Sequence, residues 1–253
     1  MILCVILKYD GGVSHELWMP IGLFALNIYA LALVLLRGPL YKTKVYRPMV
    51  LNIGLSLAPA GTLVLFGLIL LGVIAIAPAL PSVVAGLLTW VFIILGGLIW
   101  LLLLPNSAYL ITELNLSHRK KDENVPLWYD IVLVMTLALS GMFNALVNVA
   151  IAQLFIVLMI DPSIYRPGTN WHEWIALAIT LILVSLGMYL GRYMRLNSWD
   201  LLHPSSFIRK MKKHFITENN TGAAIGFVMA HSVLLLILYV IVVLPSLGSL
   251  LTP

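Results

Sequence analysis

The chain has 253 residues, of which 61% are hydrophobic and only 10% are charged, and its formal net charge is +5. A soluble domain carries roughly a quarter charged residues, so this composition excludes a single soluble domain, a disordered chain and a coiled coil. The only cysteine, Cys4, excludes an internal disulfide and cysteine-based zinc or iron–sulfur sites, and we expect no metal and no cofactor.

Long uncharged stretches predict membrane-spanning helices, because a helix pairs its backbone polar groups within one segment when no water is present. The stretch 48–112 holds 65 positions without Asp, Glu, Lys, Arg or His, and Pro78 and Pro81 divide it into two helices. We therefore predict an all-α integral membrane protein, a single helical bundle over 1–253. Its six transmembrane helices are expected at about 17–36, 50–77, 82–104, 127–159, 173–192 and 222–244.

Lys and Arg are distributed very unevenly between the connections of these spans. Thirteen of the 15 follow the first, third or fifth span, against Lys8 and Arg166 on the other side. Because Lys and Arg are retained in the cytoplasm, we expect these three connections to be cytoplasmic, both termini to be external, and the protein to be multi-pass in the inner (cytoplasmic) cell membrane. Basic residues beside a span attract anionic lipid head groups, so the positive charge does not indicate nucleic acid binding.

The third span leads into the segment LPNSAYLITEL at 104–114. Proline suits the first turn of a helix, where its missing N–H would be unpaired in any case. We predict that the chain turns at Pro105 into a short amphipathic helix in the interface, with Asn106, Tyr109 and Glu113 on one face.

The fourth span is unusually long and carries a polar row. Its 33 residues make about 50 Å of helix against a hydrocarbon core of roughly 30 Å, so it must project, tilt or break. Thr136, Ser140, Asn144 and Asn148 follow one another at i, i+4 spacing. We favour interhelical hydrogen bonds for this row, and the alternative is the wall of a wet polar cavity.

The last two spans contain small residues at four-residue spacing, which predicts close helix packing. These residues are Gly187 and Gly191 in the fifth span and Gly222, Gly226 and Ala230 in the sixth. His231 is ionisable at membrane depth and is therefore a cavity-lining candidate, although a neutral histidine bonded to a neighbouring helix is the safer interpretation. Between these spans, 205–216 is either a basic helix lying in the interface or a solvated basic loop.

Three polar segments meet at the predicted cytoplasmic face: LPNSAYLITEL, PLWYD at 126–130 and GRYMRLNSWDLLHP at 191–204. Their carboxylates (Glu113, Asp130 and Asp200) are expected to pair with Arg192 and Arg195 and to hold the helix ends in register. A site for an anionic head group or solute is the sharper alternative. The candidate ligand-binding residues are Asn106, Tyr109, Glu113, Trp128, Tyr129, Asp130, Arg192, Arg195, Asn197, Trp199 and Asp200.

These three motifs, in this order, resemble the bacterial membrane proteins of domain-of-unknown-function family 1361. The resemblance covers about Leu101 to Pro204, and it implies a polytopic inner-membrane protein with no established reaction and no known cofactor. Members of that family tend to have a proline after Ser107 and an aspartate at 113, whereas this chain has Ala108 and Glu113.

Three functions follow as hypotheses. The first is a membrane component that binds or helps to transport a small solute or lipid head group at a cytoplasm-facing polar site. The second is an assembly or regulatory partner of another membrane protein, whose basic loops dock that protein or the anionic leaflet. The third is a membrane-embedded enzyme acting on a lipid-linked substrate, with Glu113, Asp130 or Asp200 as acid or base.

Overall fold

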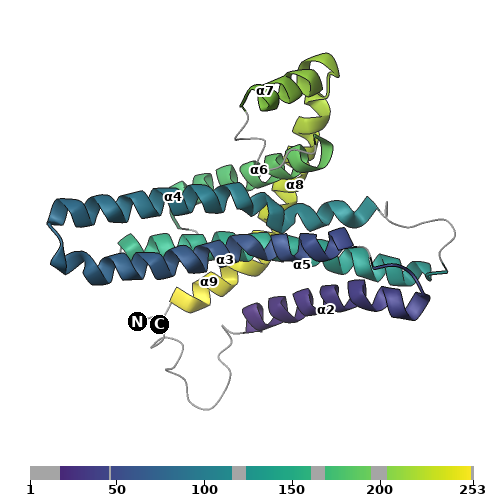
Figure 1. Cartoon of the computed structure of the whole chain (residues 1–253), viewed down its shortest axis with the longest axis horizontal. Helices are drawn as coiled ribbons and strands as arrows, with labels where there is room; N and C mark the ends of the chain where they lie inside the picture. Colours follow the sequence, from purple (N-terminus) through teal and green to yellow (C-terminus); the bar gives the residue numbers. More distant parts are fainter. Residues whose placement is uncertain (1–17, 46, 116–123, 161–168, 195–203, 252–253) are drawn as a thin grey trace, which may run out of the picture.

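A computed structural model of the chain describes residues 18–45, 47–115, 124–160, 169–194 and 204–251, and these residues form helices and no strand (Figure 1). The short elements η2 and η3 are 3₁₀-helices, and η5 and η6 are π-helices. In chain order the elements are α2 (Trp18–Tyr41), α3 (Arg47–Ile76), η2 (Ala77–Ala79), α4 (Ser82–Ala108), η3 (Tyr109–Asn115), α5 (Leu127–Ile160), α6 (Trp171–Tyr193), α7 (Pro204–Lys212), η5 (Lys213–Thr217), α8 (Thr221–Leu238), η6 (Tyr239–Val243) and α9 (Leu244–Leu251).

Six helical segments of the described chain are long and apolar enough to cross a membrane, so the protein is a multi-pass membrane protein. Each corresponds to one predicted span, which confirms a helical protein with six candidate membrane spans and the break at Pro78 and Pro81. The segments are Trp18–Tyr41, Arg47–Ala79, Ser82–Thr112, Leu127–Ile156, Trp171–Tyr193 and Thr221–Leu247. The orientation of the helices in the membrane stays a prediction.

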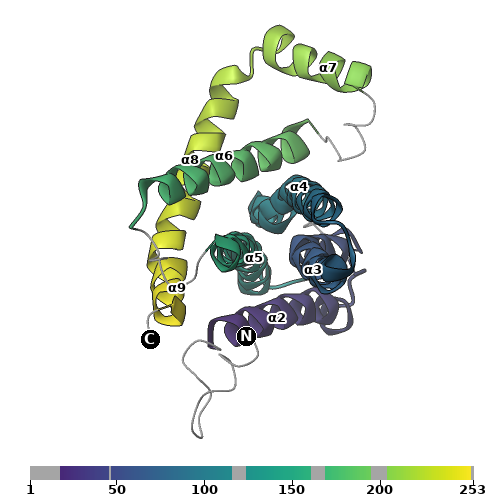
Figure 2. The same ribbon diagram turned by 90° about the vertical axis from the view of Figure 1, so that its left-hand side faces the viewer.

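Helix α5 is the centre of the bundle. Figure 2 views α3, α4 and α5 nearly end-on and shows the other helices arranged around α5. In its membrane-spanning stretch 67% of the residues are buried, against 6% in that of α3. The long fourth span does not break, because α5 is one helix of 34 residues.

The remaining helices differ in direction. Helices α3 and α4 form a long antiparallel hairpin beside α5, and α2 packs against α5 on another side (Figures 1 and 2). The rod formed by α8, η6 and α9 lies across the view of Figure 2 and is therefore steeply inclined to α3, α4 and α5. Helix α6 packs against α4 and α8 and joins this rod to the rest of the bundle.

The sequence predicts that the third span turns at Pro105, and this prediction is wrong. Helix α4 continues through this proline to Ala108, and the 3₁₀-helix η3 follows directly. Proline is tolerated inside membrane helices where neighbouring helices and local adjustments compensate for the lost hydrogen bond. Here the neighbour is α6, because a Cβ on Gly187 would lie 2.4 Å from Cγ of Pro105. The predicted close packing at Gly187 is thereby confirmed.

The corresponding prediction for the last span is wrong. A Cβ on Gly222 or Gly226 would meet no described atom within 4 Å, and Ala230 is exposed. The reason is that α8 buries a different face of its helix. That face consists of Ala224, Val228, Ser232 and Leu235.

The contact between Gly187 and Pro105 predicts a specific stability effect. Gly187→Ala places a methyl group 2.4 Å from Cγ of the rigid ring of Pro105, so we expect the free energy of unfolding to fall by about 1–3 kcal/mol. Gly226→Ala is the matched control, because its methyl group meets open space and we expect no loss there. The free energy of unfolding of both variants is measured in detergent micelles, and equal values for the two would contradict the prediction.

Candidate functional site

The polar row of α5 is buried in the bundle. Thr136, Ser140, Asn144 and Asn148 are all at most 6% exposed. Asn144 and Asn27 of α2 exchange amide hydrogen bonds of 2.9 Å in both directions. The second N–H of Asn144 is donated to Oγ of Ser56, also at 2.9 Å. Both amide hydrogens of Asn144 are therefore used between helices.

A second pair of residues extends this network to α4. The hydroxyl of Ser56 donates to the carbonyl oxygen of Ser107 at 2.9 Å, and the hydroxyl of Ser107 donates to the carbonyl oxygen of Ser56 at 2.8 Å. Both serines are fully buried. Through Asn144, one connected set of hydrogen bonds thus joins α2, α3, α4 and α5, and we call it the asparagine network (Asn27, Ser56, Ser107 and Asn144).

Two other members of the row, Ser140 and Asn148, bond within their own helix. Ser140 donates to the carbonyl oxygen of Leu137, and Nδ2 of Asn148 donates to the carbonyl oxygen of Asn144. The predicted interhelical hydrogen bonds are therefore confirmed for Asn144. That the side chains of the polar row line a cavity stays a prediction. Nδ1 of His231 donates to the carbonyl oxygen of Phe227 on its own helix, and the imidazole stacks on the Phe227 ring, so the expected bond to a neighbouring helix is wrong.

Asp130 pairs with a residue that the sequence analysis does not propose. Its Oδ1 lies 3.0 Å from Nε of Arg37 on α2, and the two side chains are 0% and 8% exposed. Nη1 of Arg37 also reaches the hydroxyl of Thr43 at 3.4 Å. Arg192, an expected partner of Asp130, lies in the last turn of α6 and makes no ion pair with a described residue.

Tyr129 completes this end of the bundle. Its hydroxyl donates to the carbonyl oxygen of Leu33 at 2.7 Å, and its ring packs edge-on against Tyr41 of α2. Both partners of Tyr129 therefore belong to the helix that also supplies Arg37. Trp128, next to it, is 61% exposed and contacts Tyr129 with its ring edge.

The predicted cytoplasmic cluster is only partly assembled in the described residues. Asn106 and Tyr109 are half-buried on α4 and η3, and Tyr109 packs beside Gly191 of α6. The side chain of Glu113 and the residues Arg195, Asn197, Trp199 and Asp200 lie outside the described residues. Of the eleven candidates, the structure thus brings together Tyr129 and Asp130, which share α2 as their neighbour.

Sequence reasoning missed Asn27, Arg37, Ser56 and Ser107. A signal existed for Arg37, since it is the only charged residue of the 24-residue helix α2. It lies inside the span, because α2 runs to Tyr41 and not only to residue 36 as predicted. A lone cation within an apolar helix calls for a buried partner.

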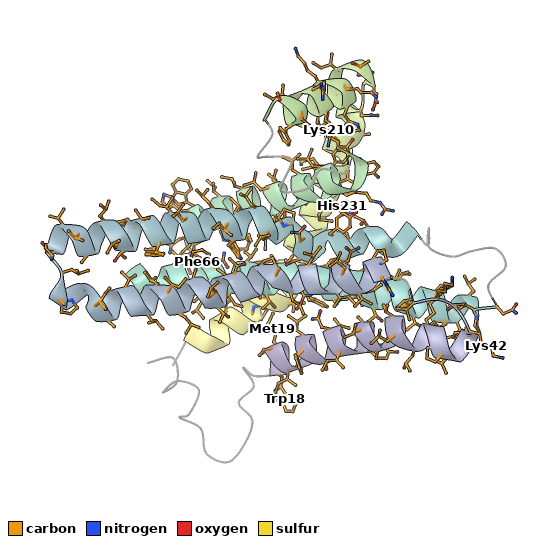
Figure 3. All side chains as sticks on the ribbon, in the orientation of Figure 1. Trp18, Met19, Lys42, Phe66, Lys210 and His231 are labelled. Atoms are coloured by element: carbon orange, nitrogen blue, oxygen red, sulfur yellow. The ribbon has the colours of Figure 1, made fainter. Side chains whose placement is uncertain are left out.

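An apolar groove of about 250 Å³ opens between α3, α4 and α5. Phenylalanine rings fill its walls where glycines give them room: a Cβ on Gly96 would lie 2.8 Å from the ring of Phe66, which lies between α3 and α4 in Figure 3. The groove is lined by Leu63, Phe66, Gly67, Leu70, Phe92, Ile93, Gly96, Gly97, Trp100, Ala152, Phe155 and Ile156.

The lining of the groove suits hydrocarbon and offers no ligand set for a metal ion. Within the described ranges, no three His, Cys, Asp or Glu side chains are grouped as a metal site requires. The chemistry that the described residues present is therefore a buried polar network next to an apolar groove.

Comparison with known proteins gives one match. A family model described as "Protein of unknown function (DUF1361)" matches residues 63–238, which is more than half of the chain, and the chain belongs to this family. This confirms the resemblance inferred from the three motifs. No curated protein and no solved structure matches the chain.

The Arg37–Asp130 pair predicts a non-additive stability effect. Arg37→Met or Asp130→Leu alone leaves one buried charge without its partner, so we expect each to lower the free energy of unfolding by about 3–5 kcal/mol. The double variant removes both charges and should lose less than either single variant. Unfolding in detergent of the wild type, the two single variants and the double variant completes a double-mutant cycle. Additive losses of unfolding free energy would contradict a coupled buried pair.

Proposed function

We propose that this member of the DUF1361 family is a lipid-binding membrane protein that holds a hydrocarbon chain in the groove between α3, α4 and α5. The observation that carries the proposal is the groove itself, about 250 Å³ in volume and lined by aliphatic, aromatic and glycine residues. Ligand sites are typically concave and mostly apolar, and this one lies between helices that are long enough to cross a membrane.

The polar residues support this choice over a solute site on α5 and over acid–base catalysis by Asp130. A solute site on α5 needs free donors, whereas both amide hydrogens of Asn144 are already bound by Asn27 and Ser56. An acid–base role for Asp130 needs an accessible carboxyl group, whereas this one is fully buried beside Arg37. We assign a structural role to both, and we place the basic connections in the cytoplasm on the Lys and Arg distribution.

Photolabelling in nanodiscs tests the groove. A phosphatidylcholine that carries a diazirine in one acyl chain should label peptides containing 92–100 and 152–156 in the wild-type protein. Gly97→Phe should remove most of this labelling, because a Cβ at Gly97 meets no atom within 4 Å and the ring can occupy the groove.

Gly86→Phe is the matched control. Gly86 lies three turns earlier on α4, also faces open space and does not line the groove, so labelling should persist in this variant. Equal labelling of the wild type and Gly97→Phe would refute a lipid chain in the groove.

A second candidate function is contact with anionic lipids through α7. Arg209, Lys210 and Lys212 of α7 and Lys213 of the following η5 are exposed, and Ile208 of α7 and Ile216 of η5 are 58% and 71% exposed. In Figure 3 Lys210 lies well away from Lys42, on a helix that stands off the bundle. Basic and apolar side chains together are typical of a helix that binds at an anionic membrane surface.

An environment-sensitive fluorophore on α7 tests this contact. Ser205→Cys in a Cys4→Ser background carries the label, and its emission should shift to the blue in nanodiscs containing phosphatidylglycerol but not in pure phosphatidylcholine. Arg209→Gln/Lys210→Gln/Lys212→Gln should abolish the shift, as should about 1 M salt, which shortens the screening length to roughly 3 Å.

The control for charge removal elsewhere is Lys42→Gln/Lys44→Gln, at two exposed basic positions between α2 and α3. We expect it to leave the emission shift intact. A shift that is the same in both lipid compositions would remove the anionic-lipid proposal for α7.

A further inference from the structure

Two buried polar atoms near the groove have no hydrogen-bond partner among the described residues: Nε1 of Trp100 and Oδ1 of Asn148. Asn148 is 2% exposed, and its Nδ2 is already donated to the carbonyl oxygen of Asn144. Buried polar atoms in folded proteins are nearly always paired, by protein or by a bound molecule. These two atoms therefore need a partner from outside the described chain.

The helix register places both atoms at the same level of the bundle. Helices α4 and α5 run antiparallel (Figure 1), and Ser107 of α4 is level with Gly141 of α5, since a Cβ there would lie 2.9 Å from the carbonyl oxygen of Ser107. Trp100 lies two turns before Ser107, and Asn148 lies two turns after Gly141. Trp100 and Asn148 therefore lie at the same level of the bundle, on opposite sides of the α4–α5 contact.

This level is the end of the groove that lies nearest to the asparagine network. Trp100 itself lines the groove, and Ala152, one turn after Asn148, does so too. A ligand chain that fills the groove therefore has one end beside Trp100 and the turn of α5 that precedes Ala152.

We propose that the natural ligand of the groove carries a hydroxyl group that accepts a hydrogen bond from Nε1–H of Trp100 and donates one to Oδ1 of Asn148. The indole nitrogen only donates and the amide oxygen only accepts, and a hydroxyl oxygen does both through one atom. A hydrocarbon end satisfies neither atom, and an ester or ether oxygen satisfies only the indole. The ligand class is a long-chain alcohol, a phenol or a hydroxylated lipid, and the inference rests on the proposed lipid-binding function.

Two matched probes test the hydroxyl group. One is 1-decanol carrying a diazirine, and the other is its methyl ether, which accepts but cannot donate; both are compared at equal mole fraction in nanodiscs. The alcohol should reach half-maximal labelling of 92–100 at a roughly tenfold lower mole fraction than the ether. Trp100→Phe and Asn148→Leu should each reduce this preference to near equality.

Labelling by the ether also reports folding, because it needs the groove and not the donated hydrogen bond. Retained ether labelling in Trp100→Phe and Asn148→Leu, together with a lost alcohol preference, supports the inference. Equal labelling of the wild type by both probes overturns the hydroxyl inference; a bound water that satisfies the two atoms would give this result. The proposed lipid-binding function of the groove would still stand. If neither probe labels the wild type, the proposed lipid-binding function is overturned as well.

Discussion

Polar side chains in hydrocarbon must find their partners within the protein, and this constraint organises the structure around α5. Asn144 provides the hub, because its amide reaches α2 through Asn27 and α3 through Ser56, and Ser56 in turn binds Ser107 of α4. Single interhelical hydrogen bonds contribute only about 0.6 kcal/mol on average in membrane proteins, so the network is better understood as fixing the register of four helices than as supplying most of their stability. Close packing, such as that of Gly187 on Pro105, adds to it.

The ion pair of Arg37 and Asp130 serves the same purpose at one end of the bundle. Helix α2 meets α5 at Asn27 with Asn144 and at Arg37 with Asp130, and these two contacts are possible together only if the helices run antiparallel in a single register. A buried ion pair is weak evidence for added stability, because the cost of removing both charges from water offsets their attraction. Its contribution is specificity: a shift of α2 along α5 would leave a charge buried without its partner.

The sequence predicts the helices well because length and charge are local properties. The uncharged stretch 48–112, its division at Pro78 and Pro81 and the polar row of α5 all follow from the sequence alone. The partners do not, because spacing shows which face of a helix is polar but not which helix lies opposite: Asn27 and Asn144 are 117 residues apart, and Arg37 and Asp130 are 93 apart. The same limit explains the errors at Pro105 and at Gly222, since tolerance of a proline and use of a glycine depend on the neighbouring helix.

The position of the groove follows from where the polar row ends. In the middle of α5, Ser56 and Ser107 join α3 and α4 to Asn144 through side-chain and backbone hydrogen bonds. Two turns later on α3 and α5, and two turns earlier on the antiparallel α4, these ties are absent from the described contacts, and rings such as Phe66 and Phe155 lie around the groove. Asn148 stands at this boundary, one turn before the groove-lining Ala152, with an amide hydrogen bound to the carbonyl oxygen of Asn144 and its side-chain oxygen buried without a partner among the described residues. A ligand that reaches this boundary would therefore contact the last residue of the row that sets the helix register, so binding in the groove and packing of the four helices would depend on the same side chain.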